Sequence, residues 1–69
     1  MSRVSMNPSL ARILLQKEAE RPGAPHLIPP HLRRAAADAA REGWLREATA
    51  EGFYRAQPGA LDAARAAIR

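Results

Sequence analysis

Apolar side chains recur at helical spacing near the start of the chain. Asn7 and Pro8 are typical of a helix start, with Asn as the N-cap and Pro at the first helical position. The apolar face that follows comprises Leu10, Ile13, Leu14 and the stem of Lys17. Residues 21–25 contain Pro and Gly and cannot continue this helix, so we expect it to end near Glu20. Residues 1–6 are expected to form a flexible arm.

A proline-rich connection follows, because residues 22–30 hold four of the six prolines of the chain. Its apolar dipeptide, Leu27 and Ile28, is expected to enter the core. The prolines leave room for one helical turn at most, around His26 to Ile28.

Pro30 starts a second helix, which we expect to run to Glu42 and to end at Gly43 in a left-handed cap. At about 100° per residue, one face is apolar and is predicted to pack inward. This inner face carries Leu32, Ala35, Ala36, Ala39 and Gly43. The opposite face carries Arg34, Ala37 and Arg41, flanked by Arg33 and Asp38.

Two short strands are predicted after this helix, over residues 44–47 and 53–56. The intervening residues 48–52 have hairpin length and contain Gly52. A last helix is expected to start at Pro58, with Leu61, Ala64, Ala67 and Ile68 on its inner face. The alternative is an all-helical protein in which residues 44–56 are a loop.

The fold class indicated by this order is mainly α with a small β-hairpin. We predict one compact winged-helix-like domain over residues 7–69, in the order helix, short connection, helix, two-stranded wing, helix. Trp44, together with Phe53 or Tyr54, is expected to supply most of the core volume. Phe53 and Tyr54 are adjacent and point to opposite faces of a strand, so one of them is expected to be partly exposed.

Two phrases of the sequence resemble winged helix-turn-helix regulators of the MarR-like and PadR-like groups. Glu42-Gly43-Trp44-Leu45 is similar to the end of their recognition helix. Residues 52–59, GFYRAQPG, are similar to the phrase that leaves the wing and opens the next helix. The resemblance covers about half of the chain. It departs from the family at Ala56-Gln57, where Leu-Thr is usual, and in the reduced middle helix.

The resemblance implies a DNA-binding surface. Residues 30–42 would form the recognition helix, and the residues facing the major groove would be Arg33, Arg34, Ala37, Asp38 and Arg41. In the wing, Arg46 and Arg55 would contact phosphates or the minor groove, with Thr49 near the tip. The alternative for the helix is an ordinary solvated face, since Asp38 is a helical neighbour of both Arg34 and Arg41.

The charge balance agrees with an anionic partner. Eleven Lys and Arg face seven Asp and Glu, giving a net charge of +4, and all cations but Lys17 are Arg. Compositional bias of a GC-rich genome also enriches Arg, Ala, Gly and Pro, and it accounts for part of this excess. Glu47 and Glu51 near the wing tip would repel phosphate.

The residue types argue against catalysis and bound cofactors. The chain has no Cys, and His26 and His31 lack the further ligands of a metal site. Ser2, Ser5 and Ser9 have no base partner in sequence, and no phosphate-binding loop is present. We therefore expect no enzyme activity, no metal, no cofactor and no small-molecule substrate. The longest apolar run is Ile13-Leu14-Leu15, so we expect a cytoplasmic protein without a membrane segment.

Two functions remain open from the sequence. The first is a small DNA-binding protein, a transcription regulator or a mobile-element accessory factor, acting on duplex DNA as a homodimer or with a protein partner. The first or last helix would be the dimer surface. The second is a protein-interaction module on the same scaffold without DNA binding, which the acidic wing and reduced middle segment favour.

Overall fold

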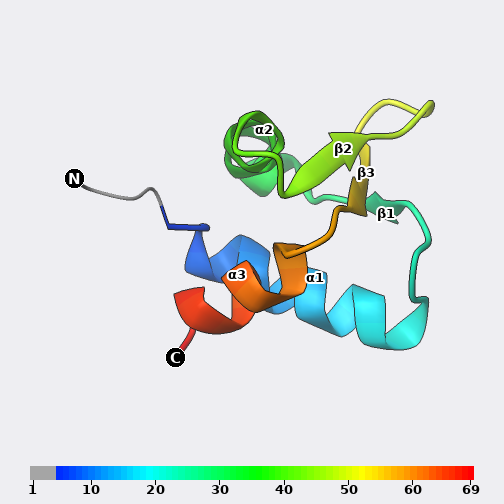
Figure 1. The fold of residues 1–69 in the computed structure, drawn as a ribbon. Coiled ribbons are helices and arrows are strands. Elements are labelled where there is room, and N and C mark those ends of the chain that lie inside the picture. Colours follow the sequence, from blue (N-terminus) through cyan, green and yellow to red (C-terminus); the bar gives the residue numbers. More distant parts are fainter. Residues whose placement is uncertain (1–4) are drawn as a thin grey trace.

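The computed structural model describes residues 5–69, and the rest of the predicted arm lies outside the described residues. Two layers are visible in Figure 1, where α1 and α3 lie together below α2 and a small sheet. The helices are α1 (Pro8–Glu20), α2 (Arg33–Arg41) and α3 (Ala60–Ala67), with a 3₁₀ turn η1 (Pro30–Leu32) before α2. The strands are β1 (His26–Leu27), β2 (Leu45–Glu47) and β3 (Phe53–Ala56). The predicted class, mainly helical with a hairpin, is confirmed.

Helix α1 begins and ends where the sequence predicts. The Asn7 side chain accepts a hydrogen bond from the backbone N–H of Leu10 at 3.1 Å, which satisfies one of the free amides of the first turn. At the other end, the backbone N–H of Arg21 donates to the carbonyl of Lys17 at 2.9 Å. The buried side chains of the helix are Leu10, Ala11 and Leu14. Met6, which the prediction places in the arm, is buried beside this helix start.

The proline-rich connection contains a strand, not the single helical turn that the sequence allowed. In β1, His26 is paired with Tyr54 and Leu27 with Phe53, antiparallel to β3. The backbone N–H of Ile28 extends the pairing by donating to the Gly52 carbonyl at 3.0 Å. Prolines before and after β1 favour extended backbone in this segment, and β3 supplies the hydrogen-bonding partners.

The second helix starts differently from the prediction but ends as expected. Its first turn is the 3₁₀ turn η1, and α2 itself begins at Arg33. After α2, Gly43 has φ +86°, and the backbone N–H of Trp44 donates to the Ala39 carbonyl at 3.0 Å. The Gly43 N–H donates to the Ala40 carbonyl at 3.1 Å. These two bonds form a Schellman cap, which turns the chain sharply into β2.

The hairpin forms, so the all-helical alternative is wrong. Leu45, Arg46 and Glu47 of β2 pair with Ala56, Arg55 and Tyr54 of β3, respectively. Since β1 pairs with the other edge of β3, the sheet has the order β1-β3-β2. The sequence predicted only the two hairpin strands, because a two-residue strand carries no periodicity.

Helix α3 begins two residues later than predicted. Pro58 and Gly59 form a turn, and Gly59 serves as the N-cap with φ +88°. Ala60 and Ala64 are the buried residues of the helix and pack against α1. Ile68 was expected on the inner face, but the helix ends at Ala67 and Ile68 is 37% exposed. The Ile68 prediction was therefore wrong.

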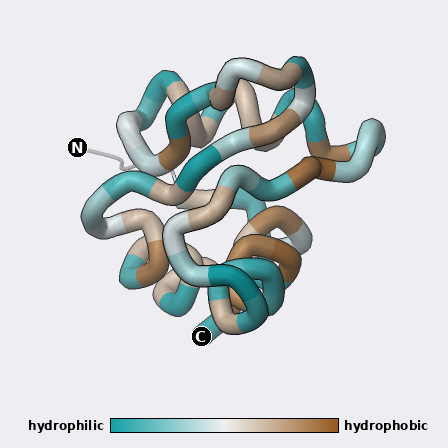
Figure 2. Tube along the Cα trace, turned by 90° about the vertical axis from the view of Figure 1, so that its right-hand side faces the viewer, coloured by the Kyte–Doolittle hydropathy of each residue, from teal (hydrophilic) through white to brown (hydrophobic). Residues whose placement is uncertain are grey.

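The core lies between the two layers and is built mainly from aliphatic side chains. Leu10, Leu14 and Ile28 are the largest fully buried residues, and Tyr54 is buried beside them. Trp44 is only partly buried, so the prediction that it supplies most of the core volume with Phe53 or Tyr54 was wrong. The prediction that one of Phe53 and Tyr54 is partly exposed is confirmed, and the exposed one is Phe53. Figure 2 shows hydrophobic segments in both layers, with hydrophilic turns around them. No helix among residues 5–69 is long and apolar enough to cross a membrane.

Candidate nucleic-acid interface

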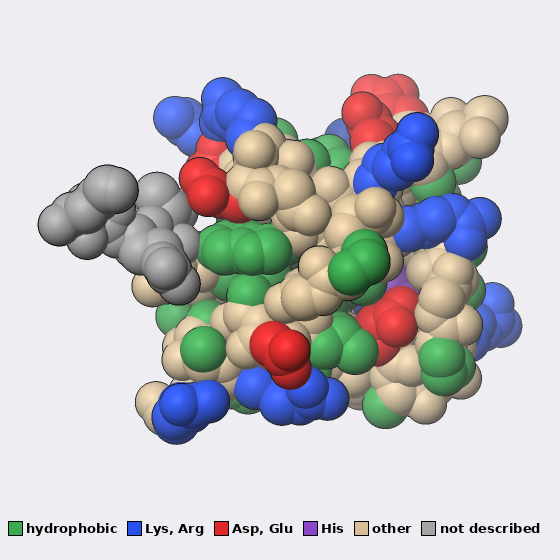
Figure 3. All heavy atoms as spheres, viewed as in Figure 1, with side chains coloured by type: hydrophobic (Ala, Val, Ile, Leu, Met, Phe, Trp, Pro, Cys, Tyr) green, Lys and Arg blue, Asp and Glu red, His purple; other side chains and the backbone are tan. Residues whose placement is uncertain are grey.

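All five predicted residues of the second helix lie on its exposed side. Ala36 and Ala39 face the core, so helical geometry turns the opposite face of α2 toward solvent. This outer face carries Arg33, Arg34, Ala37, Asp38 and Arg41, and each of them is exposed. In Figure 3, Lys or Arg side chains gather over α2 at the top of the molecule, beside carboxylates. The structure therefore presents arginines around a small residue, Ala37.

Asp38 is engaged by Arg41 one turn further along α2. The two side chains form a hydrogen-bonded ion pair, in which Arg41 Nη2 donates to Asp38 Oδ1. The side chains are 76% and 50% exposed, so water screens the attraction and the pair contributes little to stability. The guanidinium of Arg41 has five N–H donors and keeps several for another acceptor.

Arg33 connects α2 to the hairpin. Gly52 lies at the end of the β2–β3 turn with φ +84°, and a Cβ built there would lie 3.3 Å from Nη2 of Arg33. The same Cβ would lie 3.5 Å from a methyl group of Leu27. The guanidinium of Arg33 therefore covers the backbone at Gly52, at the junction of helix, hairpin and β1. A side chain larger than that of Gly would compete for this space.

Arg46 and Arg55 are directly opposite each other in the hairpin. Paired residues of adjacent strands project from the same face of a sheet, so both guanidinium groups lie on the exposed face. Leu27 and Phe53 share this face, because side chains alternate along β3. Like charges directly opposite each other destabilise a sheet. Their juxtaposition concentrates positive charge on this surface.

Arg55 has a structural contact that the sequence did not reveal. Its Nη1 donates to the backbone carbonyl of Gly23 at 2.8 Å and so ties the loop after α1 to the sheet. A shallow hollow of about 370 Å³ lies beside Arg55, Arg46 and Gln57. Glu47 and Thr49 also line this hollow, which places a carboxylate next to the two arginines. Glu51, in the hairpin turn, is exposed as well.

His26 and Glu18 form a buried pair that sequence reasoning missed. Nε2 of His26 lies 2.7 Å from Oε1 of Glu18, and their side chains are only 4% and 11% exposed. The Glu18 carboxylate also accepts the backbone N–H of Gly23, at 3.2 and 3.3 Å to its two oxygens. The pair joins α1, the following loop and β1. The hydrophobic periodicity of the sequence places neither residue in the core. His26 becomes buried only because β1 pairs with β3, and this pairing brings it to Glu18.

The buried pair does not extend into a larger polar site. Within residues 5–69, no group of three or more His, Asp or Glu side chains is arranged to hold a metal ion. His31 lies on η1, and its side chain is exposed, unlike that of His26. Glu18 and His26 hold three segments together, which is a structural role.

The residues expected at the interface thus form two neighbouring groups. Arg33 lies at the junction between the outer face of α2 and the exposed face of the hairpin.

The chain was compared with protein-family models, curated proteins and solved structures, and it matches none of them.

Proposed function

We propose that this chain binds duplex DNA through α2 and the hairpin, as a small transcription regulator or a mobile-element accessory factor. The observation that carries the proposal is the position of Arg33. Its guanidinium lies against Gly52 of the hairpin turn, and this links the arginines of α2 to those of the sheet. A surface with several exposed arginines suits the phosphate backbone, because each one can replace a condensed counterion.

The two groups of residues have different proposed roles. Arg34 and Arg41 flank the small side chain of Ala37, which permits close approach of α2 to the base edges of the major groove. Arg33, Arg46 and Arg55 contact phosphates and set the orientation of the protein. In the free protein, Asp38 accepts a hydrogen bond from Arg41. When DNA binds, a phosphate or a guanine replaces Asp38 as the acceptor.

The order of the elements supports the same proposal. A helix with exposed arginines, followed directly by a hairpin, is the arrangement that the winged helix-turn-helix resemblance implies. α2 has nine residues and reaches only a few base pairs. Useful specificity therefore requires two copies on DNA or a protein partner.

The test is the affinity for fluorescent duplex DNA, measured by polarisation at several salt concentrations. The intact protein is expected to bind with a slope of log affinity against log salt of about −3 to −5. The variant Arg34→Ala/Arg41→Ala should bind more weakly and lose about two units of that slope. The matched control is Arg12→Ala/Arg65→Ala, which removes two exposed arginines from α1 and α3. In both pairs one arginine has an aspartate partner three residues before it.

Equal weakening by the two double variants would mean that net charge alone governs binding. Absence of salt-dependent binding by the folded protein would refute the proposal.

A further inference from the structure

A groove separates α2 from the α1–α3 pair at one end of the molecule. α2 contacts η1 and β2 closely, whereas α1 and α3 pack mainly against each other. Two adjoining hollows of about 240 and 350 Å³ open between the layers, and both are lined by Ser5, Met6 and Trp44. Figure 3 shows hydrophobic side chains at the surface here, between the upper and lower parts of the molecule.

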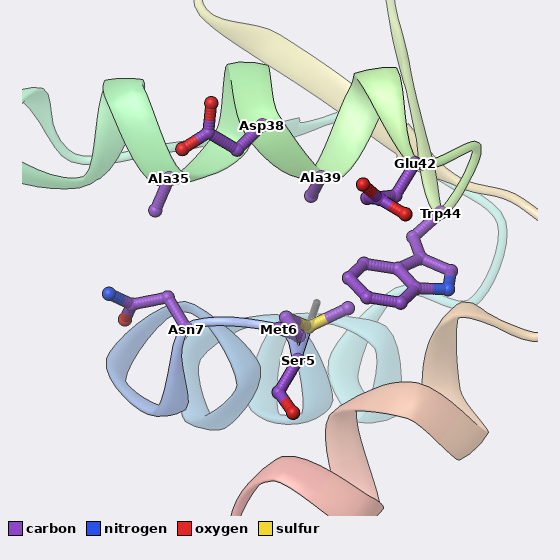
Figure 4. A pocket seen from close by; sticks show the side chains of 8 residues that line it. All are labelled: Ser5, Met6, Asn7, Ala35, Asp38, Ala39, Glu42 and Trp44. Carbon is purple, nitrogen blue, oxygen red and sulfur yellow. The ribbon is translucent and has the colours of Figure 1, made fainter. Parts of the chain in front are cut away.

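Trp44 forms the centre of this groove and is held there by its backbone. Its N–H donates to the Ala39 carbonyl at 3.0 Å as part of the α2 cap, and its carbonyl accepts the N–H of Gln57 at 2.9 Å. In Figure 4 the indole projects from the end of α2 toward Met6, with the carboxylate of Glu42 beside it. The indole is partly buried and belongs to the edge of the core.

Small side chains form the walls on both sides of Trp44. The wall from α2 carries Ala35 and Ala39, and the wall from α3 carries Ala63, Ala66 and Ala67. Alanine walls allow the backbone of another segment to approach closely. An aromatic ring at the centre of such a groove offers a large apolar contact area at little entropic cost.

The charged side chains that line this groove are all acidic. Asp38, Glu42 and Asp62 line it, and none of its described lining residues is Lys or Arg, although the net charge of the chain is +4. Asp38 pairs with Arg41 and Asp62 pairs with Arg65, in each case three residues further along the same helix. Such exposed pairs are weak and can be exchanged for a partner's cations. Three carboxylates at one groove favour a partner segment that carries cations.

We propose that this groove docks a short amphipathic helix of a partner protein, with apolar side chains flanked by Lys and Arg. The apolar face of the helix packs on Trp44 and on the accessible alanines of the two walls, and its cations meet Glu42, Asp38 and Asp62. The docking groove and the proposed DNA-binding face lie on different sides of α2 and share only the Asp38–Arg41 pair, because Arg34 and Arg41 lie on the outer face. One copy of the chain can therefore engage DNA and a protein at the same time.

The experiment uses the full chain and the emission of Trp44, its only tryptophan. The probe is a synthetic helix of about four turns, with Leu on one face and Lys on the other. The control probe keeps Leu and replaces every Lys by Glu. We expect saturable binding of the Lys probe with a blue shift of Trp44 emission, and binding of the Glu probe weaker by about tenfold or more.

Two matched variants locate the binding. Ala66→Arg places a bulky cation in the groove, and Ala37→Arg places the same side chain on the exposed outer face of α2. Ala66→Arg is expected to weaken binding of the Lys probe by about tenfold or more, and Ala37→Arg to change it by less than about twofold. Circular dichroism checks that both variants fold.

Three outcomes would overturn the proposal. The first is equal affinity for the Lys and Glu probes, and the second is equal behaviour of the two variants. The third is that neither probe changes the Trp44 emission, while sedimentation shows that the intact protein is a dimer and that Ala66→Arg is a monomer. In that case the groove would be occupied by a second copy of the chain.

Discussion

The carboxylate of Glu18 and the imidazole of His26 meet at 2.7 Å inside the protein, and this contact joins the end of α1 to the edge strand β1. Glu18 also holds the backbone N–H of Gly23, whose carbonyl accepts a hydrogen bond from Arg55. The loop between α1 and β1 is therefore held from the helix and from the sheet. In a chain of 69 residues with a small core, removal of one partner from this junction is expected to be felt in the stability.

Glu18→Ala should therefore destabilise the protein strongly. The change leaves the buried imidazole of His26 without its partner, whereas water can replace the carboxylate at the exposed Gly23 amide, and we expect a loss of about 1–3 kcal/mol in the free energy of unfolding. Urea denaturation followed by circular dichroism measures this loss. The control is Glu20→Ala, an exposed residue of the same helix. Equal stabilities of the two variants would contradict the structural role of the pair.

The pairing of β1 with β3 predicts that substitutions of two neighbouring aliphatic residues have different effects on stability. Both were expected to enter the core, but only Ile28 is fully buried, whereas Leu27 is 48% exposed on the outer face of the sheet. Ile28→Ala should cost about 2–4 kcal/mol through lost burial and a residual cavity. Leu27→Ala should cost less than about 1 kcal/mol. Thermal and urea unfolding of the two variants test the register, and a larger loss for Leu27→Ala would show that it is shifted by one residue.

Gly52 has two constraints that a substitution separates. Gly52→Ala and Gly59→Ala both place a side chain at positive φ, and each should lose about 1 kcal/mol of stability. A Cβ at Gly52 would also displace Arg33, whereas one at Gly59 meets no atom within 4 Å. On the proposed function, DNA affinity should fall by about twofold or more in Gly52→Ala only. Equal DNA affinities of the two variants would show that the position of Arg33 does not affect DNA binding.

The opposed arginines of the hairpin should differ in their effect on stability. Arg55→Met relieves the repulsion from Arg46 but removes the bond to the Gly23 carbonyl, and on balance it should cost about 0.5 kcal/mol. Arg46→Met relieves the repulsion between the paired charges and should leave stability unchanged or raise it by about 0.3 kcal/mol. Unfolding at low and high salt measures both effects. The reverse order of the two variants would show that the Gly23 contact contributes nothing.

Local signals in the sequence predicted much of the fold. Asn7 caps α1 as expected, Gly43 turns the chain after α2, and Gly52 lies at the end of the hairpin turn. Each of these signals acts within a few residues and does not depend on distant partners. The five residues predicted on the outer face of α2 are all exposed for the same reason, because the inner alanines fix the orientation of the helix.

Long-range contacts account for what the sequence did not predict. β1 has two residues and exists because β3 lies beside it, and His26 is buried because that pairing turns it inward. Trp44 was expected in the core, but it follows the cap of α2 at one end of the molecule, where the two layers leave the indole at the edge of a groove. The helix period also assigned Ile68 to the inner face, although α3 ends before it. These features depend on how the elements meet.

The most direct test of the proposed DNA-binding surface is an NMR titration of the ¹⁵N-labelled protein with a short duplex. Backbone amides and the Arg Nε–H groups report on each residue separately. We expect the largest shift changes at Arg33 to Arg41 of α2 and at Arg46 and Arg55, and we expect them to diminish at high salt. Changes confined to α3 and the surroundings of Trp44, or none at low salt, would contradict it.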